Sequence, residues 1–236
     1  MSVVLRTSSE YAIIILIWAI SSLDHRRREE FPVIFWEFFH DQSKDITPEI
    51  KKLEENVRLL KHSIEYIHTG PIIRKEDIFQ NYSLDERRKM IYTIFNFAMK
   101  CPVQYYTVAI KRKEASDRVQ LAGKLGKAIN QMLTENQEFI GAFEKVIVYY
   151  DGGQKELSSI LNAIFSIQLS NVEFRKADPR EYRLLQVADF FCSIELLRIK
   201  RNESRLSKGE TQFFYKPNEL KKTFIKGIEK KKLNKQ

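Results

Sequence analysis

An alternation of strand-like and helix-like segments between residues 103 and 199 constrains the fold more than any other feature of the sequence. Apolar, strand-prone runs occupy residues 103–110, 146–150 and 172–174. Segments with apolar residues at helical spacing follow these runs, the last at about residues 182–199. Strands that alternate with helices favour parallel pairings joined by crossover helices. The sequence therefore predicts an α/β fold.

Two apolar runs near the N-terminus, residues 11–20 and 31–39, predict a hairpin at the start of the sheet. The first run (YAIIILIWAI) has ten residues, too few to cross a bilayer, which takes about 20. Glu10 before this run and the arginines that follow it disfavour a signal peptide. We expect a buried strand or a short core helix there, and no membrane segment.

Composition indicates one folded domain over residues 1–236, because 43% of the residues are hydrophobic and no linker or repeat interrupts the chain. The two cysteines, Cys101 and Cys192, lie far apart without a CxxC pair, so no zinc site is predicted. Buried free cysteines fit a reducing compartment, and we expect a cytoplasmic protein. No signal indicates an oligomeric state.

Positive charge is concentrated at the C-terminus. Of the net charge of +9, residues 218–236 supply +5, from seven lysines and two glutamates. Leu220, Phe224 and Ile228 at four-residue spacing predict a basic tail that forms a frayed helix with a solvated lysine face. Such a tail either keeps the protein soluble or contacts nucleic-acid phosphates or acidic partners.

Local signals place two helix starts and one turn in the first half of the chain. Thr47 followed by Pro48 predicts a helix with Thr47 as its N-cap. Ser83 and Glu86 form a capping box that begins another helix. Residues 67–74 are expected to be a short extended piece with a Gly-Pro turn.

Asp151 is the first candidate site residue, because it directly follows the apolar strand predicted at residues 146–150. Ligands of open α/β sheets bind at the carboxyl ends of the strands. Alternatively, Asp151 simply caps the following helix beside Gly152 and Gly153. A phosphate cradle formed by these residues is a weaker prediction, since the spacing of a nucleotide-binding loop is missing.

Asp189 is the second candidate. It lies three residues after Gln186 in a helix that is otherwise apolar almost all round, so both polar groups lie on one helical face. An ionised carboxylate in such surroundings is costly unless it is paired or bound to a cation. The alternative to a functional role is neutralisation by Arg183, Arg198 or Lys200.

Together, Asp151 and Asp189 predict a site for Mg²⁺ or Mn²⁺, which take oxygen ligands and keep waters for phosphate oxygens. A metal held in this way activates a water and neutralises charge on a scissile phosphate. Two acids are a thin ligand set, because a nuclease of this type usually has three or four.

Four segments carry a resemblance to a known family: IHTGPIIRKE, LDERRKMIYTIFNF, KVIVYYDGGQKEL and NVEFRKADPREYRLLQVADFF. They resemble the bacterial domain of unknown function 3800 family, over about residue 40 to the C-terminus. The resemblance implies a ribonuclease-H-like mixed sheet flanked by helices and a metal-dependent hydrolase acting on phosphodiester bonds. It matches Asp151 and Asp189 to metal-binding acids, Gln186 to a neighbouring glutamine, and His68 to a ligand or proton shuttle. Taken alone, His68 is better explained as a structural histidine than as a ligand, and only the resemblance makes the two explanations equal.

One departure from that family affects the predicted chemistry. The family carries an Asp-Glu-Ser-Gly motif on its first strand, whereas residues 1–39 form a divergent N-terminal part without it, with only Glu10 and Asp24 near the first run. Loss of that acid lowers the expected metal affinity. Two hypotheses follow: a nuclease with an incomplete acidic set, or a non-catalytic nucleic-acid-binding or structural relative.

Overall fold

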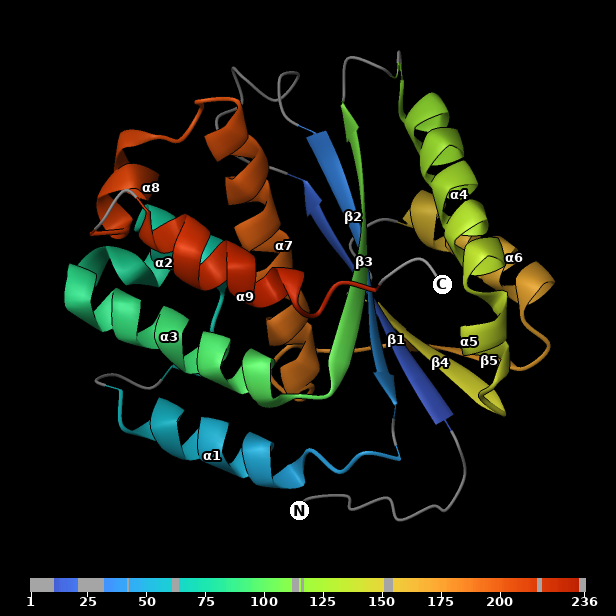
Figure 1. Cartoon of the computed structure of the whole chain (residues 1–236), viewed down its shortest axis with the longest axis horizontal. Coiled ribbons are helices and arrows are strands. Elements are labelled where there is room, and N and C mark those ends of the chain that lie inside the picture. Colours follow the sequence, from blue (N-terminus) through green and yellow to red (C-terminus); the bar gives the residue numbers. More distant parts are fainter. Residues whose placement is uncertain are drawn as a thin grey trace.

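The computed structural model describes residues 11–20, 32–41, 43–60, 64–111, 115, 117–150, 155–215 and 218–233. At its centre lies a five-stranded sheet with the order β3-β2-β1-β4-β5, covered by helices on both faces (Figure 1). The strands are β1 (Tyr11–Ile20), β2 (Pro32–Asp41), β3 (Val103–Lys111), β4 (Lys145–Tyr150) and β5 (Val172–Lys176).

The apolar run at residues 11–20 is the central strand of this sheet. β1 pairs with β2 in antiparallel and with β4 in parallel orientation. A central position with a strand on either side is where a sheet places an apolar run without alternating polar residues. The predicted strand and its hairpin with the second apolar run are confirmed.

The predicted parallel pairings hold for only part of the sheet. β4 and β5 are parallel, but β3 pairs in antiparallel orientation with β2 at the sheet edge. The reason is that β1 lies between β2 and β4, so β3 never neighbours β4. An antiparallel meander of three strands followed by two parallel strands, with helices on both faces, is the ribonuclease-H-like arrangement.

Helices cover the sheet in two layers (Figure 1). One layer contains α4 (Arg118–Glu135), α5 (Gln137–Gly141) and α6 (Lys155–Gln168). The other contains α1 (Thr47–Arg58), α2 (Thr69–Arg74), the 3₁₀-helix η1 (Asp77–Asn81), α3 (Leu84–Lys100), α7 (Arg183–Asn202), α8 (Lys208–Phe213), the π-helix η3 (Leu220–Ile225) and α9 (Lys226–Glu229). Among the described residues, no helix has the length and apolar character that a membrane crossing requires.

Strand β4 separates two apolar cores. Ile147 and Tyr149 belong to the core that also contains residues of α3 and α7, while Val146 and Val148 belong to the core under α4 and α6. Successive residues of a strand point to opposite faces, so this division shows that both faces of β4 are buried.

Local helix signals are confirmed in part. Ser83 and Glu86 form the predicted capping box of α3. Thr47, however, is the first residue of α1, and Ile46 is the N-cap. The extended piece predicted at residues 67–74 is wrong, because residues 69–74 form α2. Pro71 fits there since it lies in the first turn, where backbone N–H groups lack intrahelical partners.

The solvated basic face predicted for the C-terminal helix is confirmed, but the fraying is wrong for residues 218–233, which are folded against the domain. Leu220, Phe224, Ile225 and Ile228 are at most 5% exposed. The Phe224 ring packs against the rings of Phe95 of α3 and Phe190 of α7. Apolar residues at helical spacing are thus buried between these two helices, and only the polar side of the segment faces solvent.

Candidate active site at the start of α7

Helix α7 begins beside the carboxyl end of β4. The Tyr182 ring, at the N-cap of α7, packs on the ring of Tyr149 with 4.7 Å between centroids. Arg175 near the end of β5 donates a hydrogen bond to the Tyr149 hydroxyl at 3.2 Å. The first turns of α7 therefore lie at the sheet edge where the sequence predicts ligand binding.

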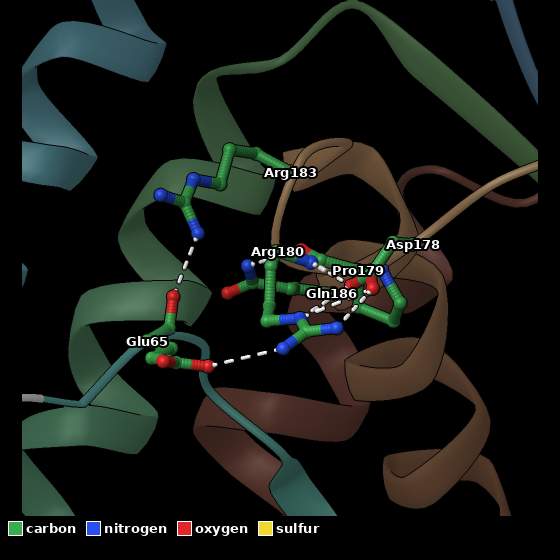
Figure 2. Close-up of polar contacts among 6 residues, drawn as sticks. All are labelled: Glu65, Asp178, Pro179, Arg180, Arg183 and Gln186. Carbon is green, nitrogen blue, oxygen red and sulfur yellow. Dashed lines mark hydrogen bonds and ion pairs between the residues drawn. The ribbon is translucent and has the colours of Figure 1, made fainter.

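Gln186 joins the start of α7 to the segment before α2. Its Oε1 accepts a hydrogen bond from the backbone N–H of Ile67 at 3.0 Å. Its Nε2 donates to the carbonyl of Pro179 at 2.8 Å (Figure 2). The side chain is buried, and both of its polar ends are satisfied, so Gln186 fixes two loops at once.

Asp189, one turn further along α7, holds the first residue of α2. Its Oδ2 accepts a hydrogen bond from the backbone N–H of Thr69 at 2.9 Å. A carboxylate at a helix N-terminus satisfies an orphan donor and is favoured by the helix dipole. Gln186 and Asp189, on one face of α7 as predicted, thereby fix the residues on either side of His68.

His68 faces Asp189, with 3.8 Å between His68 Nε2 and Asp189 Oδ1. Burial raises the pKa of the Asp189 carboxyl, while a positive charge on His68 and the hydrogen bonding of Thr69 act in the opposite direction. The Asp189 side chain remains 25% exposed and that of His68 45% exposed, so both groups reach solvent. This arrangement suits proton exchange with a bound molecule.

The three basic residues that could have neutralised Asp189 are paired with other acids. Arg198 pairs with Glu195 at 2.5 Å and Lys200 with Glu210 at 2.5 Å. Arg183 contacts Glu54 at 3.4 Å. The ionisable group that faces Asp189 is instead His68, which sequence reasoning placed in the site only through the family resemblance.

A second set of contacts, which the sequence did not predict, ties the same two segments together (Figure 2). Arg180 binds Asp178 at 2.6 Å and the Glu65 carboxylate at 3.5 Å. Arg183 donates to the carbonyl of Glu65 at 3.0 Å. The Glu65 carboxylate therefore pairs with Arg180. These partners are 115 and 118 residues apart in sequence, so no local pattern could reveal them.

Of the predicted site residues, the structure brings together His68, Gln186 and Asp189. Asp151, which follows β4 in sequence, and Asp24 lie outside the described residues. The sequence of β1 contains no acid. Asp41, at the end of β2, accepts a hydrogen bond from the backbone of Ser43.

A divalent metal fits the described residues only incompletely. Across the described ranges, no three His, Cys, Asp or Glu residues are grouped closely enough to hold an ion. Asp189 and His68 supply one carboxylate and one imidazole. Mn²⁺ accepts such ligands, whereas Mg²⁺ prefers oxygen, and either ion needs further ligands or waters. Asp151 is the remaining candidate from the sequence.

Comparison with known proteins finds structural likeness alone. No protein-family model matches the chain, and no curated protein matches it in sequence. The ribonuclease HII of Archaeoglobus fulgidus, solved in complex with PCNA, matches 84% of this chain and 79% of its own, with 12% identity and a TM-score of 0.42. The ribonuclease H2 of Pyrococcus horikoshii matches 93% of this chain and 98% of its own, with 13% identity and a TM-score of 0.42. The fold assignment rests on the strand order and pairings described above.

Proposed function

We propose that this chain is a divalent-metal-dependent hydrolase of phosphodiester bonds in nucleic acid, related to the domain of unknown function 3800 family. The observation that carries the proposal is the position of Asp189. This carboxylate lies in a largely apolar helix, faces an imidazole, and keeps a quarter of its side chain exposed. Groups with perturbed pKa values at a sheet edge are typical of functional sites.

The proposed roles follow from the contacts. Asp189 and Asp151 would hold Mg²⁺ or Mn²⁺, and the ion would supply a polarised water and charge neutralisation at the phosphate. His68 acts as a further ligand, or as a proton shuttle that takes or gives a proton at Nε2. Gln186 fixes Ile67 and so orients His68. Asp189 is itself oriented by the backbone N–H of Thr69.

A second candidate function is a non-catalytic relative that binds nucleic acid or has a structural role. Two observations favour it. The sequence of β1 offers no acid, and one oxygen of Asp189 already caps α2. A carboxylate with a capping role is retained for stability even where no metal binds.

A nuclease assay separates these candidates. Labelled single-stranded and duplex DNA and RNA are incubated with Mg²⁺ or Mn²⁺ and with wild type, Asp189→Asn, Asp151→Asn, His68→Gln or the control Glu65→Gln. Glu65 lies three residues before His68 but pairs with Arg180, so its replacement tests general disturbance of the loop. We expect metal-dependent cleavage that both aspartate variants abolish and the control retains. The proposal is contradicted if wild type cleaves with neither Mg²⁺ nor Mn²⁺, or if all variants cleave equally.

A further inference from the structure

The C-terminal segment carries a group of cations without acidic partners. Lys221, Lys222, Lys226, Lys230 and Lys232, here named the lysine face, are all exposed. Within the part of the chain that the structure describes, none of them forms an ion pair with an acidic side chain. Residues 221–232 contain a single acid, Glu229. The segment therefore presents a concentrated positive charge that no acidic side chain among the described residues pairs with.

The segment is anchored at its start. The Glu219 carboxylate accepts hydrogen bonds from Arg88 and from the Tyr92 hydroxyl, each at 2.5 Å, so this acid is committed to the interior. Phe224 is fully buried between α3 and α7, and α9 runs alongside α3 (Figure 1). A Cβ at Gly227 would lie 2.7 Å from the Phe95 ring, so the backbone packs closely against α3.

The segment is also anchored at its end. Lys231 donates to the carbonyl of Cys101 at 2.7 Å. The backbone N–H of Tyr105 donates to the carbonyl of Lys231 at 2.9 Å, and that of Leu233 donates to the carbonyl of Tyr105 at 2.8 Å. Residues 231–233 thus pair with the edge of β3. The lysine face is consequently held by a folded support, so binding does not require ordering of a flexible tail.

We infer that the lysine face is a docking surface for the phosphate backbone of nucleic acid. Lysine ammonium groups attract phosphates as point charges, and neutralisation of phosphates releases counterions. A membrane is a poorer fit, because a helix that binds the lipid interface inserts its apolar side. Here the apolar residues of the segment, among them Phe224 and Ile228, are buried in the core.

This surface goes beyond the proposed hydrolase activity, since a non-catalytic relative would use it equally. The test is fluorescence anisotropy with a labelled single-stranded DNA of about 20 nucleotides in EDTA, so that cleavage does not interfere. One triple variant combines Lys222→Gln, Lys226→Gln and Lys230→Gln. The matched control combines Lys52→Gln, Lys127→Gln and Lys208→Gln, three exposed lysines on α1, α4 and α8, and removes the same total charge.

The salt slope is the decrease of the logarithm of the affinity with the logarithm of the salt concentration, and each phosphate contact on a single strand contributes about 0.7 to it. Loss of three contacts should therefore lower the slope by about 2. It should also lower the affinity at about 0.1 M salt by about 100-fold. The control should change the affinity by less than about 5-fold, and lysine-to-arginine substitution at the three face positions should keep it. Equal losses in both triple variants would show a net-charge effect and overturn the inference, as would no loss. Retention on phosphatidylserine vesicles at a salt concentration that abolishes DNA binding would also overturn it.

Discussion

Two cation-rich regions of this molecule differ in what their charges do. At the candidate site, Arg175, Arg180 and Arg183, here named the site-edge arginines, are each bound to an acid. Arg180 hydrogen bonds lower the pKa of Asp178 to about 2. In the lysine face, by contrast, the described residues supply no acidic partner. Basic residues thus anchor loops in the first region, whereas those of the second have no acidic partner among the described residues.

The difference bears on where a polyanion would dock. The site-edge arginines have their donors occupied by Glu173, Asp178 and Glu54. A phosphate there would have to displace a carboxylate, whereas a phosphate at the lysine face displaces only mobile counterions. We therefore expect substitutions in the two regions to affect different measurements.

The largest expected effect comes from removing the support of the lysine face. Phe224→Ala deletes a fully buried ring and should lower the free energy of unfolding by about 3–5 kcal/mol. Urea unfolding followed by circular dichroism measures this loss. A loss below about 1 kcal/mol would mean that the segment is not packed as described.

A buried histidine in β2 gives the next effect. His40 of β2 is 4% exposed, and burial lowers the pKa of its imidazole from 6.5 to about 4. Its neutral form is favoured in the folded state, so its contribution to stability is complete above pH 6.5 and is lost as the pH falls toward 4. The loss should reach about 3 kcal/mol. Urea unfolding measured between pH 4 and pH 6.5 should show this pH dependence of stability in wild type and not in His40→Leu. An unchanged pH dependence in His40→Leu would show that His40 is not its cause.

Two substitutions separate the capping role of Asp189 from its proposed chemistry. Asp189→Ala removes the acceptor for Thr69 and should cost about 1–2 kcal/mol of stability. Asp189→Asn keeps an acceptor and removes a carboxyl whose pKa is raised by burial. Its stability should equal or exceed that of wild type at neutral pH, because a raised pKa marks an ionised form that burial disfavours. Thermal unfolding checks both variants, and a strongly destabilised Asp189→Asn would indicate an ion pair that stabilises the fold.

The smallest effects are expected for the site-edge arginines. The Arg180 side chain is 56% exposed, and exposed ion pairs contribute about 0–1 kcal/mol. Arg180→Gln should therefore leave stability nearly unchanged and reduce DNA affinity by less than about 3-fold. A loss of affinity comparable to that of the lysine-face variant would remove the distinction between the two regions.

Features encoded within a few residues could be predicted from the sequence. The continuous apolar run at residues 11–20 predicted a buried strand or a short core helix, and it is the central strand. Ser83 and Glu86 gave the start of α3, because a capping box is a local hydrogen-bond pattern. The three-residue spacing of Gln186 and Asp189 placed both on one face of α7.

Features that depend on distant partners could not be predicted. Gln186 holds Ile67 across 119 residues, and no periodicity encodes that contact. Asp189 provides the capping acceptor for α2 from another helix, so the local sequence of residues 67–74 looked extended. The C-terminal segment was expected to be a frayed helix, because the residues that pack around Phe224 belong to α3 and α7 and are distant in sequence.

The most direct test of the proposed site is calorimetric titration of Mn²⁺ into wild type, Asp189→Asn, Asp151→Asn and Glu65→Gln. We predict one bound ion per chain, with affinity at least 10-fold weaker in each aspartate variant and unchanged in Glu65→Gln, because loss of a ligand typically weakens metal binding by about that factor or more. Equal Mn²⁺ affinity in all four proteins, or no binding by the wild type, would contradict the assignment of Asp189 and Asp151 as metal ligands.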